Sequence, residues 1–138
     1  MKYITGSHAL NLSCALETTG DWHTSALRWE KISFKESEES IFKDWGIEFE
    51  HEIPEHAEKY AVANHIRAIL DLLEDGKFTV AQGMREDFIC DEQYTPLILE
   101  MVWKLRSCTH WIEIDKLMKR EYRLTWISYK EEKESAKN

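Results

Sequence analysis

Apolar residues in the second half of the chain recur at the three- and four-residue spacing of amphipathic helices. The first such stripe follows Pro54 and consists of Val62, Ile66, Ile69, Leu70 and Leu73. Proline suits a first helical turn, and Gly76 is a typical residue at a helix end. The pattern therefore predicts one long helix between Pro54 and Gly76.

Three further stripes predict shorter helices downstream. They are marked by Phe78, Ala81, Arg85 and Phe88, then by Ile98, Met101, Val102 and Leu105, and then by Trp111, Ile114, Leu117 or Met118, and Tyr122. Gly83 weakens the first of these helices, whereas Thr95 and Pro96 give the second an N-cap and a first-turn proline. Helices this short must pack against one another or a sheet to be stable. Residues 55–129 are thus expected to form a bundle of about four helices.

The first half of the chain favours strands. Residues 46–53 alternate apolar and polar side chains four times, which is the clearest period-two signal in the sequence. Residues 2–4 and 25–32 also fit strands. We therefore predict an α+β fold, mostly α, with a small antiparallel sheet beside the bundle. One globular domain is expected over residues 1–129, with a strand- and loop-rich acidic part (1–54), a helical part (55–129) and a frayed or disordered tail (130–138).

Composition fits one globular domain in the cytoplasm. The chain has 138 residues, 43% of them hydrophobic, and no apolar run near the roughly 20 residues that span a membrane. The N-terminus lacks the apolar core of a signal peptide. Cys14, Cys90 and Cys108 form no C-x-x-C pair, so reduced thiols are expected, with Cys90 buried, Cys108 exposed and no base beside any of them in sequence. The six histidines show no metal-ligand spacing, so no metal or cofactor is expected.

Negative charge is concentrated in one stretch of the first half. The net charge is −8, and residues 30–58 contain ten acids but three bases. A strand at 46–53 would project Glu48, Glu50 and Glu52 from one face. Such a row either faces water and blocks edge-to-edge aggregation or binds a basic partner. The charge disfavours direct binding to nucleic acid.

Tryptophans accompany these carboxylates. Trp22, Trp29 and Trp45 lie in the same half, and indoles beside carboxylates are typical of protein-binding surfaces. The leading hypothesis is a non-enzymatic regulatory module that binds a protein partner through this half, with a homodimer as the other assembly that such a surface allows. An acidic inhibitor that mimics nucleic-acid phosphates is an alternative.

One N-terminal segment suggests a different chemistry. Gly6 and Ser7 follow a predicted strand, as in turns that hold phosphate, and Asp21 and His23 come after a thirteen-residue gap. This arrangement resembles the start of minimal nucleotidyltransferases of the DNA polymerase β type, which include toxins of toxin–antitoxin and abortive-infection pairs.

The resemblance implies a site for a nucleoside triphosphate and Mg²⁺. Gly6 and Ser7 would hold the triphosphate, Ser7, Asp21 and His23 would form the catalytic centre, and Asp21 would be the first metal ligand. His23 departs from the family's second carboxylate, which implies a degenerate site because Mg²⁺ prefers oxygen ligands. The third carboxylate could be Glu48 or Glu50. The resemblance also suggests a role in a toxin–antitoxin or phage-defence pair.

Overall fold

A four-stranded mixed sheet forms one part of the fold. The computed structural model describes residues 1–21, 23 and 26–136. The strands are β1 (Lys2–Ile4), β2 (Phe34–Glu36), β3 (Ile47–Glu52) and β4 (Lys59–Ala63), in the order β2-β1-β4-β3. β1 is antiparallel to β2 but parallel to β4, and β3 is antiparallel to β4. The expectation of an antiparallel sheet is therefore wrong for the β1–β4 pair. β1 and β4 are distant in sequence, and the long connection between them permits parallel pairing.

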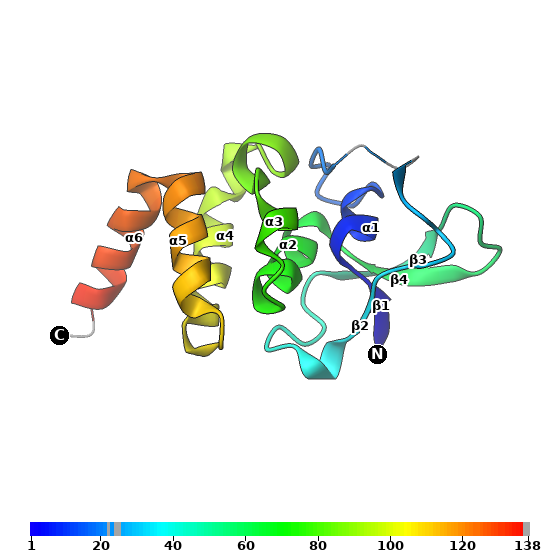
Figure 1. Ribbon diagram of the computed structural model, residues 1–138, viewed down its shortest axis with the longest axis horizontal. Coiled ribbons are helices and arrows are strands. Elements are labelled where there is room, and N and C mark those ends of the chain that lie inside the picture. Colours follow the sequence, from blue (N-terminus) through cyan, green and yellow to red (C-terminus); the bar gives the residue numbers. More distant parts are fainter. Residues whose placement is uncertain (22, 24–25, 137–138) are drawn as a thin grey trace.

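Helices make up most of the remainder and confirm the α+β class. They are α1 (Gly6–Leu10), α2 (His65–Glu74), α3 (Phe78–Ala81), α4 (Thr95–Trp103), α5 (Trp111–Tyr122) and α6 (Leu124–Ser135), with the short turns η2 (Ser37–Glu39), η3 (Met84–Phe88), η4 (Glu92–Tyr94) and η5 (Lys104–Ser107). Figure 1 shows the sheet at one end of the molecule, α2 and α3 beside it, and α4, α5 and α6 in succession towards the other end. None of the helices in the described part of the chain could cross a membrane.

The predicted long helix is divided between a strand and a helix. Val62 lies in β4, and α2 begins only at His65. Asn64 caps α2, because its side-chain oxygen accepts a hydrogen bond of 2.8 Å from the N–H of Arg67. The predicted end at Gly76 is confirmed, since Gly76 follows α2 with a φ of +76°.

The downstream helices differ from expectation mainly at their starts. Gly83 has a φ of +88° and separates α3 from the π-helical turn η3, so the expected continuous helix over 78–88 is interrupted. Thr95, expected as the N-cap, is instead the first residue of α4, and the N-cap is Tyr94, whose side chain makes no capping hydrogen bond. α5 follows the predicted stripe, with Ile114 and Tyr122 both buried.

One other segment also departs from the prediction. Residues 26–33 form no strand, and Ser25 lies outside the described residues; the strand begins only at Phe34. At the other end of the chain, α6 extends as far as Ser135, so part of the expected tail continues the last helix. Trp126, fully buried, anchors α6 and donates an indole hydrogen bond of 2.8 Å to Asp115 of α5.

Candidate functional site

The tryptophans of the first half do not form the expected exposed cluster. Trp29 is 3% exposed and packs edge-on against His8, with ring centroids 4.9 Å apart. That indole belongs to the core and is not available to a partner. Trp45 is half-buried, and its carbonyl accepts a hydrogen bond from the Arg67 guanidinium. Trp22 lies outside the described residues.

A β-bulge rearranges the glutamates of β3. Glu48 pairs with Val62 and His51 with Tyr60, so Phe49 and Glu50 together stand opposite a single residue of β4. The extra residue puts Glu48 and His51 on one side of the strand and moves Glu52 to the other. The expectation that Glu48, Glu50 and Glu52 share one face is therefore wrong.

Glu48 is engaged within the protein. Its Oε2 accepts a hydrogen bond of 2.8 Å from the N–H of Ala15, and its Oε1 lies 2.7 Å from Nε2 of His51. Glu50 and Glu52 are exposed. Of the three predicted partner-binding carboxylates, these two remain at the surface.

Phe49 is the apolar residue that sequence reasoning missed on this surface. It is 63% exposed, more than any other large apolar side chain of the sheet. β3 is also an edge strand, since among the residues described here only β4 pairs with it. Phe49, Glu50 and Glu52 thus form an exposed apolar and acidic patch on an open strand edge, which we name the β3 patch.

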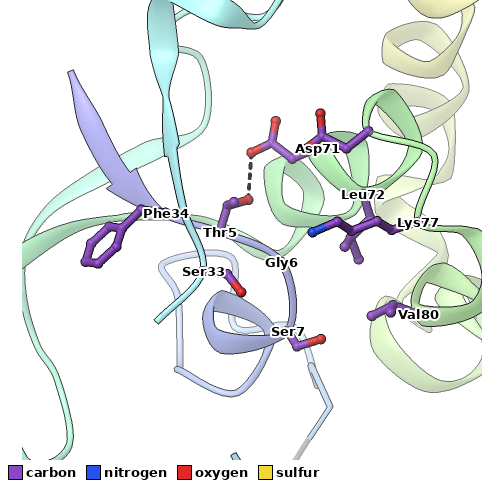
Figure 2. A pocket seen from close by; sticks show the side chains of 10 residues that line it. Thr5, Gly6, Ser7, Ser33, Phe34, Asp71, Leu72, Lys77 and Val80 are labelled. Atoms are coloured by element: carbon purple, nitrogen blue, oxygen red, sulfur yellow. Dashed lines mark hydrogen bonds between the residues drawn. The ribbon is translucent and has the colours of Figure 1, made fainter. Parts of the chain in front are cut away.

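The Gly6–Ser7 turn borders a small pocket. Gly6 has a φ of +61°, and the cavity of about 200 Å³ is lined by the hydroxyl residues Thr5, Ser7 and Ser33 together with Gly6, Phe34, Asp71, Leu72, Asp75, Lys77 and Val80. The side chain of Lys77 extends towards the turn (Figure 2). Helix α1, which begins at Gly6 beside this pocket, has only five residues.

The other residues implied by the resemblance lie elsewhere. Asp21 and His23 are in irregular chain and do not line the pocket. They contact each other directly, with 2.9 Å between His23 Nδ1 and Asp21 Oδ1, and Asn11 donates to Asp21 at 3.1 Å. The hydrogen bond that Asp21 accepts from the ring raises the pKa of His23. Across the described ranges no three His, Cys, Asp or Glu side chains gather as a metal site.

Behind the pocket, α2 buries an ion pair. Arg67 and Asp71 are 0% and 1% exposed, and the Arg67 Nε donates to an Asp71 oxygen at 2.9 Å. The other oxygen of Asp71 accepts from the Tyr3 hydroxyl at 2.7 Å and from the Thr5 hydroxyl at 2.6 Å; the bond to Thr5 is drawn in Figure 2. Buried charges need such partners because desolvation is costly. The Asp71 carboxylate, one of two that border the pocket, is therefore already satisfied by the protein.

A cluster around Cys14 was not foreseen. The Cys14 thiol lies 3.6 Å from the Thr18 hydroxyl, which lies 2.6 Å from Nδ1 of the buried His65. Cys90 is exposed rather than buried, Cys108 is half-buried, and all three cysteines are free thiols.

Sequence patterns did not indicate either of these two sites, the β3 patch and the Cys14 cluster. Phe49 stands within the alternating pattern, which predicted the strand but neither the bulge nor the exposure of this ring. Cys14 and His65 are far apart in sequence, so spacing could not connect them.

Comparisons of this chain with protein-family models, with curated proteins and with solved structures found no match.

Proposed function

We propose that this protein is a non-enzymatic interaction module that binds an extended, basic segment of a protein partner at the β3 patch. The observation that carries the proposal is Phe49, an aromatic ring 63% exposed on an edge strand and followed by the exposed carboxylates of Glu50 and Glu52. Trp29 takes no part, because it is buried. The acidic, aromatic surface expected from the sequence is thus reduced to a smaller one around Phe49.

An open strand edge supports binding of an extended peptide. Such a segment adds a strand by main-chain hydrogen bonds, while pockets and side chains of the edge give specificity. Fully burying a phenylalanine contributes on the order of 2 kcal/mol. Glu50 and Glu52, together with the net charge of −8, favour a basic partner and speed its association.

The backbone at Glu50 is consistent with a recognition role. Its φ of +56° lies in the left-handed region that favours glycine. A side chain there costs roughly 1–2 kcal/mol, and such strain is often retained at functional sites. Glycine would form this bulge more easily but would remove the carboxylate beside Phe49.

Site-specific photo-crosslinking tests the proposal. A photoreactive phenylalanine analogue at position 49 is expected to capture a defined protein in cells, whereas the same analogue at Ile112 captures none. Ile112 is a matched control because it is 69% exposed on α5, which packs beside α6 away from the sheet (Figure 1). Equal capture at the two positions would contradict the proposal.

The affinity of the purified pair gives the quantitative test. We expect Phe49→Ser to weaken binding at least tenfold, about 1.4 kcal/mol, and Ile112→Ser to leave the affinity unchanged. Glu50→Lys with Glu52→Lys should reduce mainly the association rate. Thermal unfolding of each variant confirms that the fold is kept. A Phe49→Ser protein that binds with undiminished affinity refutes the role of the patch.

Two measurements distinguish the alternatives. A mimic of nucleic acid binds through charge, so its affinity falls steeply with added salt; binding through Phe49 and the strand edge should fall much less. A nucleotidyltransferase binds Mg²⁺-ATP, which calorimetry detects. We expect no heat, because Asp21 and His23 do not line the pocket at Gly6 and Ser7.

A further inference from the structure

Cys14 lies at the start of a chain of hydrogen-bonding groups that ends in a buried histidine. Its sulfur is 3.6 Å from Thr18 Oγ1, and that oxygen is 2.6 Å from Nδ1 of His65. His65 is 1% exposed and is the first residue of α2, whereas Cys14 is half-buried in the loop before Thr18. The thiol thus has both a path to solvent and a base within the protein.

The hydrogen bonds define how a proton can move along this chain. Nε2 of His65 lies 2.6 Å from the carbonyl of Leu12, which can only accept, so Nε2 carries a proton. In the neutral ring Nδ1 is then the acceptor, and it accepts from the Thr18 hydroxyl. The Thr18 oxygen in turn can accept from the thiol. A proton can therefore pass from Cys14 to Thr18 while the hydroxyl proton of Thr18 passes to His65.

Close packing holds the imidazole in this orientation. The Leu12 carbonyl fixes one ring nitrogen and Thr18 the other. Gly20 packs so closely that a Cβ there would lie 2.8 Å from Cε1 of His65. Because the ring is confined on several sides, the acceptor nitrogen stays directed at Thr18.

Charge on the neighbouring elements favours ionisation of the pair. Burial raises the pKa of the Cys14 thiol, but its interactions with the nearby His65 and with Thr18 outweigh this effect and bring the pKa to about 7. Burial lowers the pKa of His65, but the contacts with Cys14 and Leu12 and the charge of Glu48 on β3 raise it overall. The Glu48 carboxylate also contacts the imidazole of His51, which is the other titratable side chain on the same side of β3.

We propose that Cys14 is the reactive thiol of this protein, activated through Thr18 by His65, and that it is the residue that hydroperoxides oxidise. The thiolate sulfur attacks one oxygen of hydrogen peroxide, forming an S–O bond as the O–O bond breaks. The sulfur loses two electrons and the peroxide gains them. The leaving hydroxide takes the proton that had passed to His65, again through Thr18, and departs as water. The product is a sulfenic acid at Cys14.

The other two cysteines serve as internal controls. Cys90 is exposed and its sulfur lies 3.5 Å from the Thr19 hydroxyl, which is exposed. Cys108 is half-buried, and burial raises the pKa of its thiol. All three thiols can be followed in one sample of the intact protein.

Alkylation as a function of pH tests the activation. The folded protein is treated briefly with limiting iodoacetamide between pH 5.5 and 9.5, and peptide mass spectrometry measures each cysteine. We expect the Cys14 rate to reach half its maximum near pH 7, and Cys108 to do so well above the pH of about 8.5 that is usual for free cysteine. The midpoint reports ionisation and does not depend on how accessible the sulfur is. A Cys14 midpoint at or above the pH of about 8.5 that is usual for free cysteine overturns the proposal.

Matched variants test the relay. Thr18→Val removes the connecting hydroxyl with little change in shape and should raise the Cys14 midpoint by about one pH unit or more. Thr19→Val, at the neighbouring threonine that contacts Cys90, should leave the Cys14 profile unchanged. An unchanged midpoint in the Thr18→Val protein refutes activation through Thr18. If that variant does not fold, the wild-type profile still decides whether Cys14 is activated.

Peroxide treatment tests the oxidation itself. Dimedone traps sulfenic acids, so brief exposure to hydrogen peroxide at pH 7 followed by dimedone should label Cys14 at least several-fold more than Cys90 or Cys108. Comparable labelling of the three cysteines, or labelling mainly at Cys90, overturns the assignment.

Discussion

Replacing Asp71 with asparagine should cause a large loss of stability. The side chain is 1% exposed and accepts hydrogen bonds from Arg67, Tyr3 and Thr5. An asparagine at this position would leave the fully buried Arg67 guanidinium without its counter-charge and would direct an amide N–H₂ at groups that are themselves donors. Removing one partner of a buried ion pair costs about 3–5 kcal/mol. For a domain of this size that lowers the midpoint of thermal unfolding by roughly 10 °C or more.

Denaturant unfolding followed by circular dichroism measures this loss. Asp75→Asn is the matched control at the end of α2, because the Asp75 side chain is 42% exposed and its ion pair with Lys35, at 2.8 Å, should contribute under about 1 kcal/mol. In a double-mutant cycle, Arg67→Met with Asp71→Asn should cost at least about 1.5 kcal/mol less than the sum of the single changes. A loss below about 1 kcal/mol for Asp71→Asn, or additive single changes, would refute the importance of the pair.

Three further predictions concern other parts of the molecule. Glu50→Gly should stabilise the protein by about 1 kcal/mol, because residue 50 has a φ of +56°; no gain in denaturant unfolding would show that the bulge is not strained. Burial raises the pKa of Glu74, but hydrogen bonds from Ile41 and Ser40 and the charge of Lys35 lower it overall. The ionised Glu74 side chain therefore stabilises the fold above its unfolded-state pKa near 4.5, and this stabilisation is lost as the pH falls through the lower folded-state pKa. When the free energy of unfolding is measured against pH, Glu74→Gln should make its decrease at acid pH less steep. Tyr122→Phe should leave stability unchanged or raise it by up to about 1 kcal/mol, because the buried hydroxyl meets no hydrogen-bond partner among residues 1–21, 23 and 26–136; a clear loss would reveal a partner.

Local periodicity predicts the helical half well because burial there follows the helix repeat. In α5 the predicted stripe matches the buried face, from Ile114 to Tyr122. Val62 shows the limit of the same method. It fits both the helical stripe and the alternation of a strand, and its pairing with Glu48 of β3 and with the distant Ile4 of β1 places it in β4. Sequence spacing does not carry that long-range contact, so neither the parallel pair nor the start of α2 could be predicted.

The candidate sites were harder to predict, for two physical reasons. Trp29 lies in irregular chain, where no repeat indicates which side chains are buried, and its contact with His8 makes it part of the core. The β3 glutamates are arranged by a bulge, which one positive φ at Glu50 produces and which alternation of side chains cannot reveal. The composition correctly indicated an acidic first half, but the backbone decides which carboxylates reach solvent.

That bulge also connects the two sites that we propose. Because it adds a residue after Glu48, the strand turns Glu48 and His51 towards one side while Phe49 remains exposed. On that side Glu48 accepts the N–H of Ala15, the residue that follows Cys14, and its charge favours the protonated form of His65. A regular strand would instead align Glu48 with Glu50 and separate it from His51. The irregularity in β3 therefore places His51 beside the carboxylate that contacts the Cys14 cluster, in the same strand as the exposed ring of the β3 patch.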